Sequence, residues 1–121
     1  MSRTRASARA AGARFERQIA DWLAEHLDDR IDRRVKRGSK DRGDLSGIRT
    51  VMNGQVVAEC KNTARTDLAG WISEAETERG NDDAVAGVVI SKRHGNANPA
   101  DQWVHMTLAD FVALITGSRP E

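Results

Sequence analysis

Residues 55–61 read Gln-Val-Val-Ala-Glu-Cys-Lys, a short stretch rich in β-branched residues that follows an Asn-Gly turn signal at 53–54. We expect this stretch to form a strand, and side chains alternate across a strand. The two faces would carry Val57, Glu59 and Lys61 on one side and Val56, Ala58 and Cys60 on the other. An acidic and a basic side chain side by side at the end of an apolar strand indicate either a polar site or a surface ion pair.

Asp44 precedes Glu59 by fourteen intervening residues and lies in Gly43-Asp44-Leu45, where we expect another strand to begin. If the two strands are neighbours, the carboxylates of Asp44 and Glu59 can hold a divalent metal ion beside Lys61. Such a site can position a water molecule for attack on a phosphate. The pattern therefore predicts a metal-dependent nuclease, and an ion pair on an edge strand is the alternative.

Length and composition predict one domain with a modest core, because the chain has 121 residues of which 39% are hydrophobic and 31% charged. No apolar run approaches the length of a transmembrane helix, and the N-terminus lacks the apolar segment of a secretory signal. Cys60 is the sole cysteine, which excludes an internal disulfide. We expect a cytoplasmic protein (in the host cytoplasm if viral) with no membrane partner, and Cys60 as a small buried hydrophobe.

The charge is distributed unevenly along the chain. Residues 1–42 carry 12 Lys/Arg against 7 Asp/Glu, and residues 43–121 carry 7 against 11. The positive side chains gather near the N-terminus and in the stretch 30–42, which fits binding to a phosphate backbone, although solvated tails are the alternative. We expect three parts, namely a basic flexible arm at 1–12, a single domain at 13–116 and a frayed tail at 117–121.

Apolar periodicity predicts a helix over residues 8–28. Its buried stripe would consist of Phe15, Ile19, Trp22, Leu23 and Leu27. Glu16 falls at the edge of that stripe, where a carboxylate belongs to a salt bridge, points outward, or forms part of a site.

The remaining elements alternate between strands and helices. Strands are expected near 31–36, 44–52, 55–61, 84–91 and 102–106. One helix should run from an N-cap at Thr66 to about Gly80, and a capping-box pattern from Thr107 to Asp110 should open another through Ile115. The order helix, three strands, helix, two strands, helix describes an α/β fold with a mixed sheet flanked by helices.

Together, Glu16, Asp44 and Glu59-x-Lys61 resemble the PD-(D/E)xK nuclease superfamily, and within it the archaeal-type Holliday junction resolvases and their phage relatives. The resemblance covers about residues 13–115. It also includes Phe15-Glu16-Arg17, Gly38-Ser39-Lys40 and a later helix with Trp71. Gly43 precedes Asp44 where the superfamily often has proline. The resemblance implies a restriction-endonuclease-like mixed sheet flanked by helices.

It also implies the chemistry of the site. Asp44, Glu59 and the backbone carbonyl of Cys60 would coordinate Mg²⁺ or Mn²⁺, and Glu16 would complete the site directly or through a water molecule. Lys61 would orient the nucleophile or neutralise the phosphate. The family has a phosphate-contacting arginine on the first strand, and Arg33, Arg34 and Lys36 all remain candidates for it. The full set of expected DNA-binding residues is Arg3, Arg5, Arg33, Arg34, Lys36, Arg37, Ser39 and Lys40.

The resemblance implies a Mg²⁺-dependent endodeoxyribonuclease that resolves four-way DNA junctions by paired nicking as a homodimer, with no small-molecule cofactor. The alternatives are a related nuclease acting on flaps, single strands or duplex, and a non-catalytic nucleic-acid-binding protein. Exposed apolar side chains would form the dimer interface unless they pack on the sheet. They are Leu68, Trp71, Ile72 and Ala75 on one helix and Leu108, Phe111, Val112 and Ile115 on the last.

Overall fold

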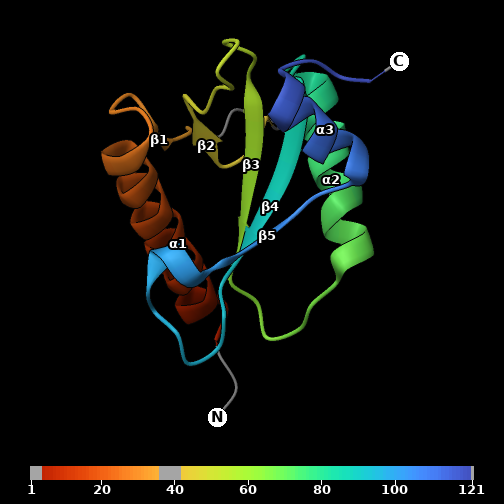
Figure 1. Ribbon diagram of the computed structural model, residues 1–121. Coiled ribbons are helices and arrows are strands. Elements are labelled where there is room, and N and C mark those ends of the chain that lie inside the picture. The colour runs from red at the N-terminus through yellow and green to blue at the C-terminus, as the bar shows by residue number, and fades with distance from the viewer. Residues whose placement is uncertain (1–3, 36–41, 121) are drawn as a thin grey trace.

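Within residues 4–35 and 42–120, which the computed structural model describes, a five-stranded sheet forms the centre of the protein (Figure 1). Its strands, in their order across the sheet, are β1 (Asp32–Arg33), β2 (Leu45–Ser46), β3 (Val56–Lys61), β4 (Ala86–Ser91) and β5 (Trp103–His105). β3 and β4 are parallel, and the other neighbouring pairs are antiparallel. The predicted α/β class with a mixed sheet is confirmed.

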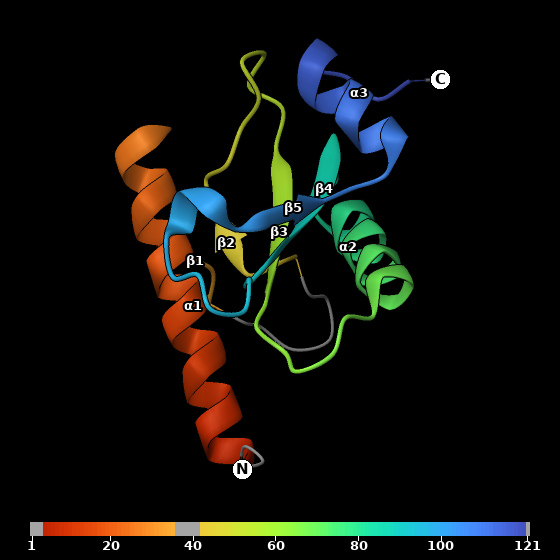
Figure 2. The same cartoon turned by 60° about the horizontal axis from the view of Figure 1, so that its bottom comes forward.

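Helices cover both faces of this sheet (Figure 2). The described helices are α1 (Arg5–His26), α2 (Leu68–Asn81) and α3 (Leu108–Thr116), with a 3₁₀ turn η1 (Pro99–Asp101) before β5. On one face, Phe15 and Ile19 of α1 join β2, β3, β4 and Ala113 of α3 in the main apolar cluster. On the other face, Trp71 and Ala75 of α2 pack on Val89 of β4.

The alternation expected for β3 is confirmed. Val56 and Ala58 belong to the cluster on the α1 face, and the half-buried Cys60 packs against it. Glu59 and Lys61 point to the face covered by α2, where Lys61 contacts a carboxylate of that helix. Burying one apolar set therefore turns the acidic and basic residues of the motif toward α2.

Helix α1 begins earlier than predicted and buries a narrower stripe. The Thr4 hydroxyl caps it by accepting a hydrogen bond of 3.0 Å from the Ser7 backbone nitrogen, so residues 5–12 of the predicted arm are helical. Phe15 and Ile19 are buried as expected. Leu27, predicted in the stripe, lies beyond the helix and is 66% exposed.

Strand β2 spans only Leu45–Ser46, whereas the sequence predicted a strand over 44–52. The next residue, Gly47, has φ of 86°, and a Cβ there would lie 2.9 Å from the carbonyl oxygen of Arg30. The left-handed backbone conformation of Gly47, so close to the backbone of Arg30, turns the chain away from the extended conformation and ends the strand. The chain then reverses at the predicted Asn53-Gly54 turn, where the Asn53 nitrogen donates to Thr50 O.

Helix α2 begins one residue later than predicted. Asp67, not Thr66, is the N-cap, and its carboxylate accepts a hydrogen bond of 3.2 Å from the Gly70 nitrogen. Aspartate and threonine are both favoured caps, so their adjacency made the choice ambiguous. At α3 Thr107 is the N-cap as predicted, because its Oγ1 accepts from the Asp110 nitrogen at 3.1 Å, and the Asp110 side chain binds the Thr107 hydroxyl.

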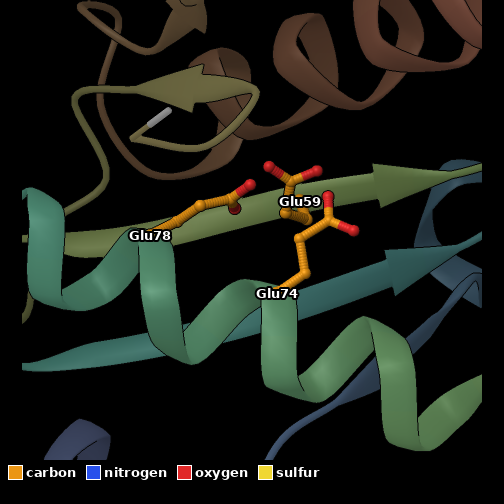
Figure 3. A group of neighbouring side chains, drawn as sticks. All are labelled: Glu59, Glu74 and Glu78. Carbon is orange, nitrogen blue, oxygen red and sulfur yellow. The ribbon is translucent and has the colours of Figure 1, made fainter. Parts of the chain in front are cut away.

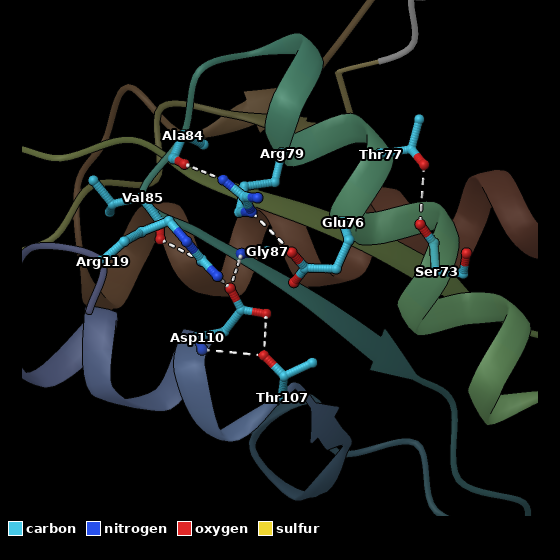
Figure 4. A network of polar contacts seen from close by, with 10 residues as sticks. All are labelled: Ser73, Glu76, Thr77, Arg79, Ala84, Val85, Gly87, Thr107, Asp110 and Arg119. Atoms are coloured by element: carbon cyan, nitrogen blue, oxygen red, sulfur yellow. Dashed lines mark hydrogen bonds and ion pairs between the residues drawn. The ribbon is translucent and has the colours of Figure 1, made fainter. Parts of the chain in front are cut away.

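An ion pair between the buried Asp110 and the partly buried Arg119 lies at the open edge of β4 (Figure 4). β5 pairs with Val89, Ile90 and Ser91, and no described strand pairs with the first half of β4 on that side. Asp110, which is fully buried, accepts hydrogen bonds from the Gly87 nitrogen (3.3 Å) and from Arg119 Nη1 (2.6 Å). Arg119 also donates to Val85 O at 2.9 Å, so the tail predicted to fray is anchored at this residue.

We predict that Asp110→Ala lowers the free energy of unfolding by about 3 kcal/mol, because it removes the carboxylate that pairs with Arg119 and leaves the Gly87 N–H without its acceptor. Denaturant unfolding of the purified variant measures this. Asp29→Ala, at an exposed position after α1, is the matched control and should change stability by less than about 0.5 kcal/mol. Equal stability of the Asp110 variant and the control would contradict a structural role for the ion pair.

Candidate active site

Glu59 lies near the end of β3, on the face that α2 covers, and is only 3% exposed. Its neighbour across the parallel pairing is Val89, which packs against Trp71 and Ala75. The Oε1 atom of Glu59 is buried and has no hydrogen-bond partner among the described residues. A buried carboxylate oxygen of this kind is costly unless a proton or a cation neutralises it.

Asp44 directly precedes β2 and meets the end of β3 from that side. Its Oδ2 accepts a hydrogen bond of 2.8 Å from the Cys60 nitrogen, and its own nitrogen donates to Ala58 O at 2.9 Å. Gly43, with φ of 96°, makes this approach possible, since a Cβ there would lie 2.8 Å from Val57 Cγ1. The two halves of the sequence motif are therefore adjacent, and glycine before Asp44 has a steric reason.

Two further carboxylates come from α2 (Figure 3). The side chains of three residues converge here: Glu59, Glu74 and Glu78. Each has a carboxylate oxygen that lies within 4.8 Å of a carboxylate oxygen of the other two. Glu78 is 3% exposed, and Glu74 is exposed at the rim. Neither residue was predicted from the sequence. Their signal was the spacing Trp71, Glu74, Ala75, Glu78, which places Glu78 beside the buried Trp71 and Ala75 and Glu74 at the edge of that helix face.

Electrostatics within the cluster follow from this crowding. Burial, followed by the neighbouring Glu78 and Asp44 carboxyl groups, raises the pKa of Glu59 to about 11. Burial lowers the pKa of Lys61, but the carboxylates of Glu74, Glu59 and Asp44 outweigh burial and raise it. Without a cation in the cluster, burial and the neighbouring carboxyl groups therefore favour the neutral form of Glu59.

Lys61 binds one of the new carboxylates. Its Nζ lies 3.1 and 3.2 Å from the two oxygens of Glu74 and 4.0 Å from Glu59 Oε2. The side chain is partly accessible, at 19% exposure. The ammonium group thus lies at the opening of the cluster, held by an exposed partner that another anion can replace.

The donor set fits a hard divalent cation. Carboxylate oxygens are the ligands that Mg²⁺ and Mn²⁺ prefer, and the orphaned Glu59 oxygen among like charges is the environment that a cation relieves. The residues at hand for this are Asp44, Glu59, Glu74 and Glu78. Cys60 contributes its backbone nitrogen to Asp44, while its side chain packs against the apolar cluster on the opposite face.

Glu16 lies on α1, where its Oε1 is 3.4 Å from Arg33 Nε. This ion pair matches the salt bridge that was one of the alternatives for Glu16 at the edge of the apolar stripe of α1. Glu16 and Arg33 line a cavity of about 660 Å³ together with Arg9 and Arg34. The cavity is open enough for a negatively charged ligand to meet three arginines.

The other predicted DNA contacts are only partly covered by the structure. Arg5 is exposed in the first turn of α1, and Arg34 Nη2 lies 3.4 Å from Asp82. Arg3, Lys36, Arg37, Ser39 and Lys40 lie outside the described residues, as does Gly38.

Comparisons of the chain with protein-family models, with curated proteins and with solved structures found no match. None of the helices in the described part of the chain combines the length and the apolar character needed to cross a membrane. Any functional assignment therefore rests on the residues of the site and on their geometry.

We predict that the metal-free protein loses stability as pH rises, and that Glu59→Gln reduces this loss. The folded-state pKa of Glu59 is raised, so its contribution is complete below the unfolded value of about 4.3 and declines as pH rises toward the folded pKa. The difference between wild type and variant should approach, at most, about 1.4 kcal/mol per pH unit.

Melting temperatures in EDTA between pH 5 and 9 measure this difference. Added Mg²⁺ should stabilise the wild type and leave Glu59→Gln unchanged, since only a folded-state ligand site shifts the unfolding equilibrium. Parallel pH profiles for the two proteins would show that Glu59 is not buried beside other carboxylates.

Proposed function

We propose that this protein is a metal-dependent, structure-selective DNA endonuclease of the PD-(D/E)xK type that resolves four-way junctions. The observation that carries the proposal is the buried Glu59 beside Asp44 and Lys61 at the end of a central strand. A small domain keeps such a costly group when it serves a site. The mixed α/β sheet flanked by helices is compatible with this type of nuclease.

The carboxylates of Asp44, Glu59 and Glu78 would hold Mg²⁺ or Mn²⁺, with Glu74 at the rim. When bound, the cation supplies a Lewis acid that activates water and stabilises charge on phosphate oxygens. Lys61 would bind the phosphate in place of Glu74, because both are anions within reach of the same ammonium group. Glu16 would act from the side of α1, where its partner Arg33 can bind a neighbouring phosphate.

Several positive side chains can bind the DNA backbone around this site. Arg9, Arg33 and Arg34 line one cavity with Glu16, and Arg5 is exposed on the same helix. Contacts of this kind position the DNA without reading its sequence.

Exposed apolar side chains on α3 support the homodimer. Leu108 is 77%, Phe111 49% and Ile115 69% exposed, whereas Trp71 and Ala75 of α2 are buried. Trp71 and Ala75 thus pack on the sheet, which was the alternative for them, while Leu68 of α2 is 45% exposed. A twofold dimer through α3 would place one site near each of two opposed strands of a junction, which has approximate twofold symmetry.

We predict that Asp44→Asn and Glu59→Gln each lower Mg²⁺-dependent cleavage roughly 100-fold or more and leave DNA binding within about twofold. The assay uses a synthetic four-way junction, a flap and plain duplex, with and without Mg²⁺. Glu16→Gln and Glu78→Gln, tested on the same DNA, assign the third carboxylate. Glu25→Gln on the exposed side of α1 is the control, and full activity in both Asp44 and Glu59 variants would move the site elsewhere.

We predict a stable homodimer without DNA at micromolar concentration, and Ile115→Asp should convert it to a monomer by placing a charge in an apolar interface. Sedimentation measures the mass of both proteins. Leu27→Asp is the control, because Leu27 is about as exposed as Ile115 but follows α1 and not α3, and this variant should leave the dimer intact. A monomer mass for the wild type would remove paired nicking by a preformed dimer.

A further inference from the structure

A second cavity, of about 260 Å³, opens beside the candidate active site and shares Lys61 with it. Its other walls come from Trp71 of α2, from the loops after β3 and β4, and from the ends of β4 and β5. None of the described residues that line it is acidic, whereas Arg93, His94 and Lys61 supply positive or protonatable groups. The cavity therefore favours an anion, in contrast to the neighbouring carboxylate cluster.

Trp103 gives this cavity an aromatic surface. The residue lies on β5, at the edge of the sheet, and is 53% exposed. The guanidinium carbon of Arg93 lies 4.2 Å from the centroid of its ring and covers one face. The ring surface that Arg93 does not cover is accessible to a planar ligand, since aromatic groups stack on such surfaces.

The loop that carries Arg93 and His94 is held in place by partly buried polar contacts. Lys92 Nζ donates to Arg93 O (2.6 Å) and to Asn96 O (2.8 Å), so this lysine supports the loop. Gln102 Oε1 accepts from the Arg93 nitrogen at 2.6 Å. The arrangement is organised before any ligand arrives, which lowers the entropic cost of binding.

We propose that this cavity binds one unpaired deoxynucleotide of a branched DNA substrate, with its base on Trp103 and its phosphate beside Arg93 and His94. An aromatic face next to cations is the chemistry of single-strand recognition. A base inside a duplex is already stacked, so only an unpaired base can use the ring. The shared Lys61 places this nucleotide next to the phosphate to be cleaved, and its assignment to DNA rests on the proposed nuclease function.

The test measures binding in EDTA, where no cleavage occurs, with the full chain and a forked DNA that carries one unpaired 2-aminopurine at the branch. Stacking of the 2-aminopurine base on Trp103 should change its fluorescence when the protein binds. Trp103→Leu should abolish this change and weaken binding to the fork roughly tenfold, while binding to plain duplex stays within about twofold. Trp103→Phe, which keeps an aromatic face, should retain most of the fork affinity. Melting curves confirm that both variants fold.

Unchanged fork affinity in Trp103→Leu, or an equal loss for fork and duplex, would overturn the nucleotide site. Competition by free dTMP at the concentration of the fork would assign the cavity to a mononucleotide instead of a DNA strand. A fall from dimer to monomer mass in Trp103→Leu would assign the ring to self-association. If the fork result holds but the wild type cleaves no DNA with Mg²⁺, the nuclease proposal fails and the nucleotide site stands.

Discussion

The parallel pairing of β3 with β4 is the constraint on which the rest of the structure depends. Parallel neighbours cannot be joined by a hairpin, so the chain must cross over the sheet, and α2 is that crossover. A crossover helix lies on one face of the two strands it joins. The side chains of β3 that point to that face, Glu59 and Lys61, are consequently brought against α2, whatever the residues of α2 are.

The two faces of the sheet therefore differ in composition for a physical reason. The α1 face collects the large apolar side chains and supplies most of the burial that stabilises a chain of this length. The α2 face has a smaller apolar cluster of Trp71, Ala75 and Val89, with carboxylates beside it. Carboxylates whose oxygens lie within 4.8 Å of one another destabilise the fold unless a proton or a cation compensates their charge. The apolar core on the α1 face therefore offsets the destabilising carboxylates on the α2 face.

The sequence predicted the parts of this arrangement that depend on local pattern. The alternation in β3, the Asn53-Gly54 turn and the Thr107 cap follow from strand period, turn chemistry and capping, and each was confirmed. The early end of β2 could not be predicted from the sequence, because it depends on how closely Gly47 approaches the carbonyl group of Arg30 in the folded chain. Glu74 and Glu78 were missed because only the crossover brings their helix face to Glu59.

The ion pair between Lys61 and Glu74 links the two halves of the proposed site. Glu74 can neutralise Lys61 or join the carboxylates that surround a cation, and it cannot do both fully. Withdrawal of Glu74 from Lys61 leaves the ammonium group available to a DNA phosphate. Binding of a cation and binding of DNA should therefore favour each other, and thermodynamic linkage requires this coupling to be equal in both directions. In the proposed nuclease, this pairing would keep the ammonium group of Lys61 from the phosphate until both the cation and the DNA are present.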